Sequence, residues 1–295
     1  MLDDLEALIA LREHGTMTKA ATALRLSQSA ISKRITALGS ELGIELLRPV
    51  GRRVQLTPFA AELVERTAPL LSELRVLIRS GRSALSGELP IAVSESVLAS
   101  WGPRLLARVQ SDVPGVRFSV AAHRSPVAID LARSGEVMLA LVAGQAEGAA
   151  DLAAHTVGHE PMVVVTAPGS NEPCRDGRLS VMAIEPHAAT WQSVESRLRR
   201  MSELELEITA TLQSFAALTQ MARAGFGAAL VPLGIAQAMR VGRGSILAFP
   251  GAGLTRPISL IGRIRTFDGA LVSAVSASLE RHARATIPDP PRETL

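Results

Sequence analysis

Hydrogen-bonding and cationic side chains gather on one face of a short helix that the sequence predicts near its start. Over residues 28–38 the apolar positions recur at helical spacing, and the other face carries Gln28, Ser29, Ser32, Lys33, Arg34 and Thr36. Gln can form two hydrogen bonds with adenine, and Lys or Arg can bind guanine. Ser and Thr suit phosphate oxygens or base edges. Residues 25–38 include three cations and no acid, so this face suits DNA. The alternative is that it is only the solvated side of a small helical bundle.

Two further helices and a hairpin are predicted to position this face. Residues 2–14 have apolar positions at helical spacing and are followed by Gly15, a natural helix stop. Thr16 or Thr18 can cap a second, alanine-rich helix, and Ser27 can cap the third. Two short strands, 46–48 and 53–56, flank a turn with Arg52 and Arg53 at its tip. This is the pattern of a wing that lies along phosphates, so the sequence predicts a winged helix-turn-helix.

The segment that follows has the spacing of a dimerisation helix. Thr57 can cap it, Pro58 suits its first turn, and Pro69 is expected to bend it. Three- and four-residue steps join the members of a heptad seam: Ala60, Leu63, Thr67, Leu70, Leu74, Leu77, Gly81 and Ala84. We therefore expect this helix to join two copies of the chain, the alternative being a helix packed on its own domain. A dimer predicts a DNA target with two-fold symmetry.

Strands and helices alternate over the remaining two thirds of the chain, which predicts an α/β domain with a largely parallel sheet. The first series has strands at 89–93, 116–121 and 137–142, with helices at 97–109 and 127–133. A Gly/Ala-rich connection at 143–150 leads to the second series. Its strands are 162–166, 206–211, 228–231 and 258–264, and its helices are 191–201, 215–224 and 267–285. The last helix is expected to fold back onto the first lobe.

Polar residues stand where strands of this domain end and helices begin. Ligands bind at such places because helix N-termini offer free N–H groups. We expect four groups to line one cleft between two lobes: Ser94, Glu95 and Ser96; His123, Arg124 and Ser125; Thr190; Gln213 and Ser214. Arg124 could pair with an anionic ligand and Glu95 with a cationic one. The alternatives are plain helix caps for each Ser or Thr and surface charges for Arg124 and Glu95.

About forty N-terminal residues resemble the signature of the LysR family of bacterial transcription regulators. The match runs in order through Thr18-Lys19-Ala20-Ala21, Leu24, Ser27 to Ser32, Ile35, Leu38, Leu42-Gly43, Leu46-Leu47-Arg48, Arg52-Arg53 and Leu56-Thr57-Pro58. Gly39 stands where the family usually has Glu, Leu47 where it has Phe, and Phe59-Ala60 where it has Ala-Gly. Residues 135–141 and 224–232 resemble the family's effector-binding domain, which is like a periplasmic binding protein; Met138 replaces an Asp.

The resemblance implies how the two parts would work. The residues that would face the major groove are Gln28, Ser29, Ser32, Lys33 and Arg34. The wing would contain Arg52 and Arg53, and Thr18 and Ser27 complete the DNA-binding set. It also implies a homodimer, a homotetramer through the sensor lobes, a small-molecule effector and room for RNA polymerase as a further partner. Residues 94–101 and 135–137 resemble family members that respond to basic amino acids and control exporters, which would place Glu95 near a ligand amine. A regulator without an effector is the alternative.

Composition supports a two-part cytoplasmic protein. The chain has 295 residues, 47% hydrophobic and 20% charged, which suits two or three globular units. The net charge of +3 does not by itself indicate a nucleic-acid partner. Cys174 is the only cysteine, which excludes an intrachain disulfide and a cysteine-based zinc site and fits a reducing compartment. The acidic start does not resemble a signal peptide, and no run of about 18 apolar residues predicts a membrane span.

An enzyme and a secreted solute-binding protein are the rival classes. Cys174 has no neighbouring His, His155 and His159 lack the HExxH pattern, and Gly225 and Gly227 follow a helix rather than a strand. A solute-binding protein would need a signal sequence and lacks the N-terminal module. We therefore predict a non-enzymatic α+β multidomain regulator without a cofactor. Its expected parts are a DNA-binding domain (1–57), a linker helix (58–86) and an effector domain (87–295). The first lobe would comprise about 87–160 and 265–295, and the second about 161–264.

Overall fold

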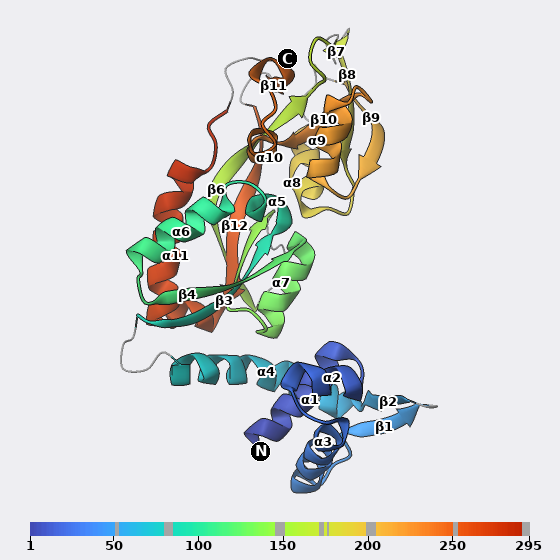
Figure 1. Ribbon diagram of the computed structural model, residues 1–295, viewed down its shortest axis with the longest axis vertical. Coiled ribbons are helices and arrows are strands. Elements are labelled where there is room, and N and C mark those ends of the chain that lie inside the picture. The colour runs from blue at the N-terminus through green and yellow to red at the C-terminus, as the bar shows by residue number, and fades with distance from the viewer. Residues whose placement is uncertain are drawn as a thin grey trace. The chain divides into compact units, whose positions relative to one another are not determined.

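The computed structural model describes residues 1–50, 53–79, 85–144, 151–170, 174–175, 177–198, 205–249 and 253–290. The chain forms two compact units, one containing residues 1–78 and the other most of residues 79–295. Figure 1 shows the elements of each unit, coloured along the chain. None of the helices in the described part is both long and apolar enough to cross a membrane.

The N-terminal unit contains three short helices, a hairpin and a longer helix. The helices are α1 (Leu2–His14), α2 (Met17–Leu24) and α3 (Gln28–Leu42); β1 (Leu47–Val50) pairs antiparallel with β2 (Arg53–Leu56), and α4 (Pro58–Arg79) follows. Leu8, Leu11, Ile31, Ile35 and Leu38 are buried in one core with the small alanines of α2. This unit is therefore a winged helix-turn-helix, as the sequence predicted.

Side-chain caps explain where α2 and α3 begin. Thr16 is the cap of α2, since its side chain accepts a hydrogen bond from the Lys19 N–H. Thr18, the other candidate, lies inside α2. Ser27 accepts from the Ala30 N–H and caps α3 as predicted. The predicted end of α3 at residue 38 was wrong, because the helix continues to Leu42 and stops at Gly43, whose φ is +68°.

Helix α4 starts at Pro58 as predicted, with the Thr57 hydroxyl accepting from the Ala60 N–H at 3.2 Å. The start of the predicted seam packs on its own unit, because Ala60 and Leu63 join the N-terminal core. Further along, Leu70 is 57% exposed and Leu74 is 37% exposed. Gly81 and Ala84 lie outside the described residues. The helix thus packs on its own domain at one end and leaves an apolar stripe uncovered farther along.

A mixed sheet runs through the C-terminal unit, with strand order β4-β3-β5-β12-β6-β10-β8-β7 in its described part. These strands are β3 (Gly87–Ser94), β4 (Val116–His123), β5 (Leu139–Ala143), β6 (Leu152–Val165), β7 (Cys174–Arg175), β8 (Arg178–Ile184), β10 (Ala228–Pro232) and β12 (Leu254–Arg263); β9 (Glu205–Leu212) pairs with β8 and β11 (Ile246–Ala248) with β6. Strand β3 is parallel to β4 and β5, and β8 is parallel to β9 and β10. The long strands β6 and β12 pair antiparallel with each other, so the sheet is only partly parallel.

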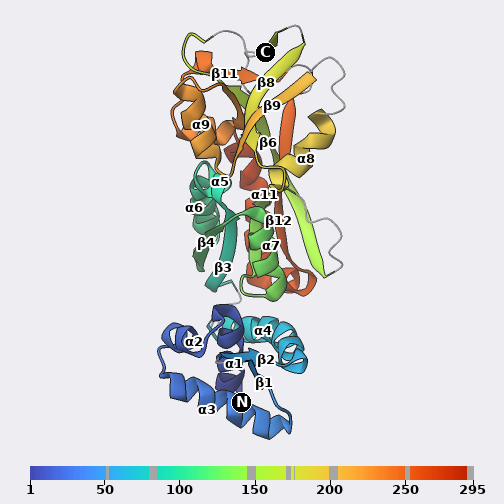
Figure 2. The same cartoon turned by 90° about the vertical axis from the view of Figure 1, so that its right-hand side faces the viewer.

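Two lobes form around separate cores, and β6 and β12 run from one into the other (Figures 1 and 2). The first lobe holds β3, β4, β5, α5 (Glu95–Leu98), α6 (Gly102–Asp112), α7 (Ser125–Ser134) and α11 (Ala270–Thr286). The second holds β8, β9, β10, α8 (Ala189–Leu198), α9 (Phe215–Arg223) and α10 (Leu233–Ala238). The last helix, α11, packs on α6, which confirms that the chain returns to the first lobe.

Several predicted elements were wrong in their extent, each for a local reason. The strands predicted from residues 162 and 258 begin earlier, because β6 and β12 pass through Pro161 and Pro257, which normally stop a central strand. The single helix predicted at 97–109 is two helices, because Gly102 and Pro103 open α6 and separate it from α5. Strand β8 and helix α10 had no prediction. Residues 145–150 of the predicted loose connection lie outside the described residues.

Candidate functional site

The exposed face of α3 brings most of the predicted DNA-binding residues together. Six of these residues are exposed in the N-terminal unit: Thr18, Ser27, Gln28, Ser29, Ser32 and Lys33. The Thr18 hydroxyl donates to the Gln28 amide oxygen at 3.4 Å, and the Ser27 and Ser29 hydroxyls lie 2.9 Å apart. The Thr18 contact links the first turn of α2 to the first turn of α3. The result is a polar surface that includes Lys33, with no acid among residues 25–38.

Arg34 lies apart from the other predicted DNA-binding residues. Its guanidinium donates to the backbone oxygen and to the carboxylate of Asp3, both at 3.3 Å, and its side chain is 30% exposed. The contact joins α3 to the first turn of α1. Arg34 is therefore engaged in holding two helices together in this structure, unlike Ser32 and Lys33, which precede it.

The hairpin that follows α3 has the position predicted for the wing. Leu47 faces Leu56 and Arg48 faces Gln55 across the antiparallel pair, and the Arg48 guanidinium lies 3.5 Å from the Gln55 amide oxygen. Arg53 belongs to β2. Arg52, predicted at the tip, lies outside the described residues.

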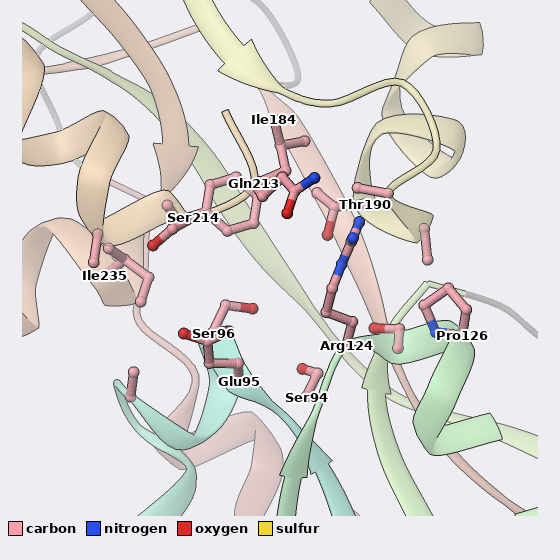
Figure 3. A pocket seen from close by; sticks show the side chains of 16 residues that line it. Ser94, Glu95, Ser96, Arg124, Pro126, Ile184, Thr190, Gln213, Ser214 and Ile235 are labelled. Atoms are coloured by element: carbon pink, nitrogen blue, oxygen red, sulfur yellow. The ribbon is translucent and has the colours of Figure 1, made fainter. Parts of the chain in front are cut away.

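A cleft between the two lobes of the C-terminal unit collects eight of the nine residues predicted for it. The first lobe contributes Ser94, Glu95, Ser96, Arg124 and Ser125, and the second contributes Thr190, Gln213 and Ser214. Figure 3 shows Glu95 and Ser96 on one side, with Gln213 and Ser214 across from them. Apolar side chains, including Ile184, Phe215 and Ile235, fill in the lining. The structure does not place His123, the last residue of β4, in this lining.

Several lining residues also serve the fold. Ser125 donates to the Ala143 carbonyl at 3.1 Å, and Ser214 accepts from the Ala217 N–H and caps α9. Arg124 forms an ion pair with Glu185, which follows β8 in the second lobe. Ser214 is therefore a helix cap, which was the alternative to a ligand-binding role. Arg124 already has the Glu185 carboxylate as its anionic partner. Glu95 is exposed at the rim.

Other hydroxyls face the cleft with less of their hydrogen-bonding capacity used. Ser94 is 3% exposed, and its hydroxyl has no hydrogen-bond partner among the described residues. Ser96 and Thr190 each accept one hydrogen bond from a buried arginine. Thr190 was predicted to precede the helix, but it lies within the first turn of α8. Ser96 and Thr190 each keep a proton to donate, so these two hydroxyls suit a polar ligand in the cleft.

Sequence reasoning missed the ion pair behind these hydroxyls. Glu160 of β6 and Arg256 of β12 are register partners in the crossing strands, and both side chains are 0% exposed. The Glu160 carboxylate accepts from Arg256 Nε at 3.0 Å and from Nη2 at 2.7 Å. It also accepts from the Trp101 indole N–H at 3.0 Å and from the Gly234 N–H at 3.1 Å. The sequence did carry a signal, since each charge stands beside a proline that precedes an apolar run.

In the part of the chain that the structure describes, no group of His, Cys, Asp and Glu side chains could hold a metal ion. The fold and the two sites define a class: a helix-turn-helix unit with a polar exposed helix face, joined to a two-lobed unit with a cleft between its lobes.

Family models identify both units. Residues 2–61 match the bacterial regulatory helix-turn-helix protein model of the lysR family, and residues 82–284 match the LysR substrate binding domain. The chain therefore belongs to the LysR family of transcriptional regulators, and it is a DNA-binding regulator with an effector-binding domain. The sequence predicted this family, and it predicted a regulator rather than an enzyme.

Individual proteins agree with this assignment. An uncharacterized HTH-type transcriptional regulator of Vibrio cholerae is 27% identical over 282 residues, which are 95% of each chain. A full-length OxyR variant from Pseudomonas aeruginosa superposes with a TM-score of 0.71 at 16% identity, over 100% of this chain and 99% of that one. Full-length LysG from Corynebacterium glutamicum, with bound effector Arg, gives 0.57 at 19% identity, over 98% and 100%. The two solved structures show that the fold is shared.

Proposed function

We propose that this regulator binds a two-fold symmetric operator as a cytoplasmic homodimer, and that a small molecule in the interlobe cleft modulates this binding. The proposal rests above all on the exposed face of α3, where hydrogen-bonding side chains and Lys33 occur without an acid. Residues 1–57 would bind DNA, 58–86 would join the copies, and 87–295 would sense the effector. The family's DNA-binding role supports this division.

In the proposed complex α3 enters the major groove with its N-terminal half. Gln28, Ser29 and Ser32 would read base edges, while Thr18, Ser27 and Lys33 would position the helix on phosphates. The wing, with Arg52 and Arg53, would follow the phosphate backbone. The Arg34–Asp3 contact supports a different role for Arg34, which would hold α3 against α1 rather than read a base.

Dimerisation through α4 is supported by its uncovered stripe. Leu70 and Leu74 lie four residues apart on one helix face and are both exposed. Two such stripes can pack against each other as a coiled-coil seam. A pair of dimers joined through the sensor lobes would form the homotetramer that the family resemblance implies, and DNA-bound regulators of this kind can also contact RNA polymerase.

An amino acid is the effector class that the cleft favours within this proposal. The hydroxyls of Ser96 and Thr190 can bind a carboxylate, and the exposed Glu95 can bind an amine. LysG, which shares the fold, carries bound Arg. The resemblance of residues 94–101 to regulators that respond to basic amino acids points the same way.

DNA binding is tested with the full chain and the DNA upstream of its own gene, by mobility shift and footprinting at several salt concentrations. We expect protection of a two-fold symmetric site. Ser32→Ala should lower the preference for this site over unrelated DNA, by about 1–3 kcal/mol if a bidentate base contact is lost. Ser111→Ala, an exposed serine on α6, is the matched control. Equal preference in the two variants would reject a reading role for Ser32.

The wing has a separate test, because its contribution should not depend on sequence. Arg52→Ala should weaken binding to every DNA and flatten the dependence of affinity on salt, since one phosphate contact releases about one counterion. Unchanged salt dependence would show that the wing does not follow the backbone.

A further inference from the structure

An ion pair at the flank of α3 occupies a cation that adjoins the polar DNA-binding face. Arg34 follows the exposed Lys33 directly, but its side chain is 30% exposed and reaches the first turn of α1. There it donates from Nη1 to the Asp3 backbone oxygen and from Nη2 to the Asp3 carboxylate, both at 3.3 Å. One of the three cations of residues 25–38 is therefore bound by an acid from another helix.

Asp3 belongs to a group of acids near the start of α1. Asp4 pairs with the Met1 ammonium at 2.8 Å, and Glu41 is exposed on the last turn of α3. The pKa of the Met1 ammonium is raised, first by its hydrogen bond to Asp4 and further by the charges of all three acids. The three carboxylates therefore lie near one point, and Arg34 stands between them and the polar face of α3.

A paired arginine and a free one act differently on DNA. A free cation that contacts a phosphate releases counterions, and each such contact adds about 0.9 to the slope of log affinity against log salt concentration. Arg34 can form this contact only by giving up its charge-assisted hydrogen bond to Asp3. While the pair is intact, its two charges cancel, so it adds little attraction for the DNA backbone.

We propose that Asp3 is a positioning residue that withholds Arg34 from the phosphates of duplex DNA and so limits sequence-independent binding. The proposal rests on the proposed function, because it takes the exposed face of α3 as the DNA-binding surface. Asp3 acts through Arg34 and does not touch the DNA. A phosphate contact carries no sequence information, so withholding it weakens binding to all DNA alike and leaves discrimination to the residues that read bases.

The first experiment releases Arg34 and measures how binding depends on salt. The full-length Asp3→Ala protein is titrated onto a duplex of unrelated sequence at several salt concentrations and followed by fluorescence anisotropy. We expect the slope to become steeper by about 0.9 and the affinity at low salt to rise several-fold. Glu41→Ala is the matched control, since it removes one exposed acid from the same group and leaves the Arg34–Asp3 pair in place. An equal change in both variants would reflect only a general loss of negative charge and would overturn the proposal.

The second experiment shows whether the change passes through Arg34. Arg34→Gln should leave the slope unchanged when Asp3 is present, and should return the slope of Asp3→Ala to the wild-type value. A slope lowered by about 0.9 in Arg34→Gln alone would show that Arg34 already contacts a phosphate, and would overturn the proposal. Weaker binding by Asp3→Ala would show that the pair only holds α3 against α1, and would also overturn it. Asp3 is 71% exposed, so these variants should fold, which circular dichroism checks.

The preference for the upstream region over unrelated DNA distinguishes this inference from the function on which it rests. We expect Asp3→Ala to keep the wild-type preference, because both complexes gain the same phosphate contact. A changed preference would show that the released Arg34 reads a base, which would overturn the inference and leave the DNA-binding face in place. Equal affinity of the wild-type protein for both DNAs would reject the proposed function itself.

Discussion

Replacing Glu160 by Gln should strongly destabilise the C-terminal unit. The side chain keeps its shape, and its amide oxygen can still accept from Trp101 and Gly234. Arg256, however, keeps its charge at 0% exposure without a counterion, because arginine stays protonated in proteins. Breaking one partner of a buried ion pair costs about 3–5 kcal/mol. That is a large part of the 5–15 kcal/mol by which domains are typically stable.

Tryptophan fluorescence can follow this unit alone, since the only tryptophans of the chain are Trp101 and Trp191. With a urea dependence of about 2 kcal/mol per molar, the loss corresponds to a midpoint lower by about 1.5–2.5 M. Glu205→Gln is the matched control, because Glu205 pairs with Arg178 at 3.3 Å on the surface, where both are more than half exposed. An exposed pair contributes about 0–1 kcal/mol.

The comparison between the two Glu→Gln variants decides the question. If Glu160→Gln shifts the midpoint no further than Glu205→Gln, the buried pair carries no special stability and the charge argument is refuted. Adding Arg256→Met to Glu160→Gln should recover part of the loss, because the uncompensated charge is gone. A double variant less stable than the single one would contradict that reasoning.

Gly234→Ala should also lower the urea midpoint reported by tryptophan fluorescence, because a Cβ there would lie 2.5 Å from the buried carboxylate oxygen; a wild-type midpoint would contradict the expected clash. Asp112→Asn should flatten the dependence of stability on pH below about 4, since hydrogen bonds from Ser278 and then His282 hold the pKa of the Asp112 carboxyl below its usual value. A lowered pKa stabilises the folded state above the unfolded pKa, and this is lost as the pH falls through the folded pKa; acid unfolding as steep in the variant as in wild type would disprove it. Leu70→Asp should convert dimers to monomers in sedimentation velocity, because it places a charge on the exposed stripe of α4; an unchanged mass would locate the dimer contact elsewhere.

Local signals made the N-terminal unit predictable from sequence. Caps and stops lie within a few residues of the helices that they bound, as Thr16, Ser27 and Gly15 show. The one clear error, the end of α3, occurred at Gly39, where the absence of a Cβ permits close approach of the Ile44 carbonyl. A glycine that serves packing inside a helix resembles a glycine that ends one, and the sequence alone does not distinguish them.

The cleft was predictable for a different reason. Its polar residues stand at strand ends or helix starts, and the carboxyl ends of parallel strands meet at one edge of a sheet. That rule placed eight residues correctly from four separate parts of the chain. It failed for His123, because the rule locates a segment and does not say which way a side chain points. It also did not show that Arg124 would pair with Glu185, a residue beyond a strand that had no prediction.

Glu160 and Arg256 show where such rules end. They are 96 residues apart and become neighbours only because two antiparallel strands cross between the lobes in one register. The two strands were predicted to start at residues 162 and 258, so neither residue was assigned to a strand. This placement also lets Arg256 connect the two lobes. Arg256 donates to Ser96 in the first lobe and to Thr190 in the second, so a movement that separates the lobes must break one of these hydrogen bonds. A ligand that binds both hydroxyls adds a second link across the same gap, and its affinity therefore depends on the lobe arrangement that Arg256 holds.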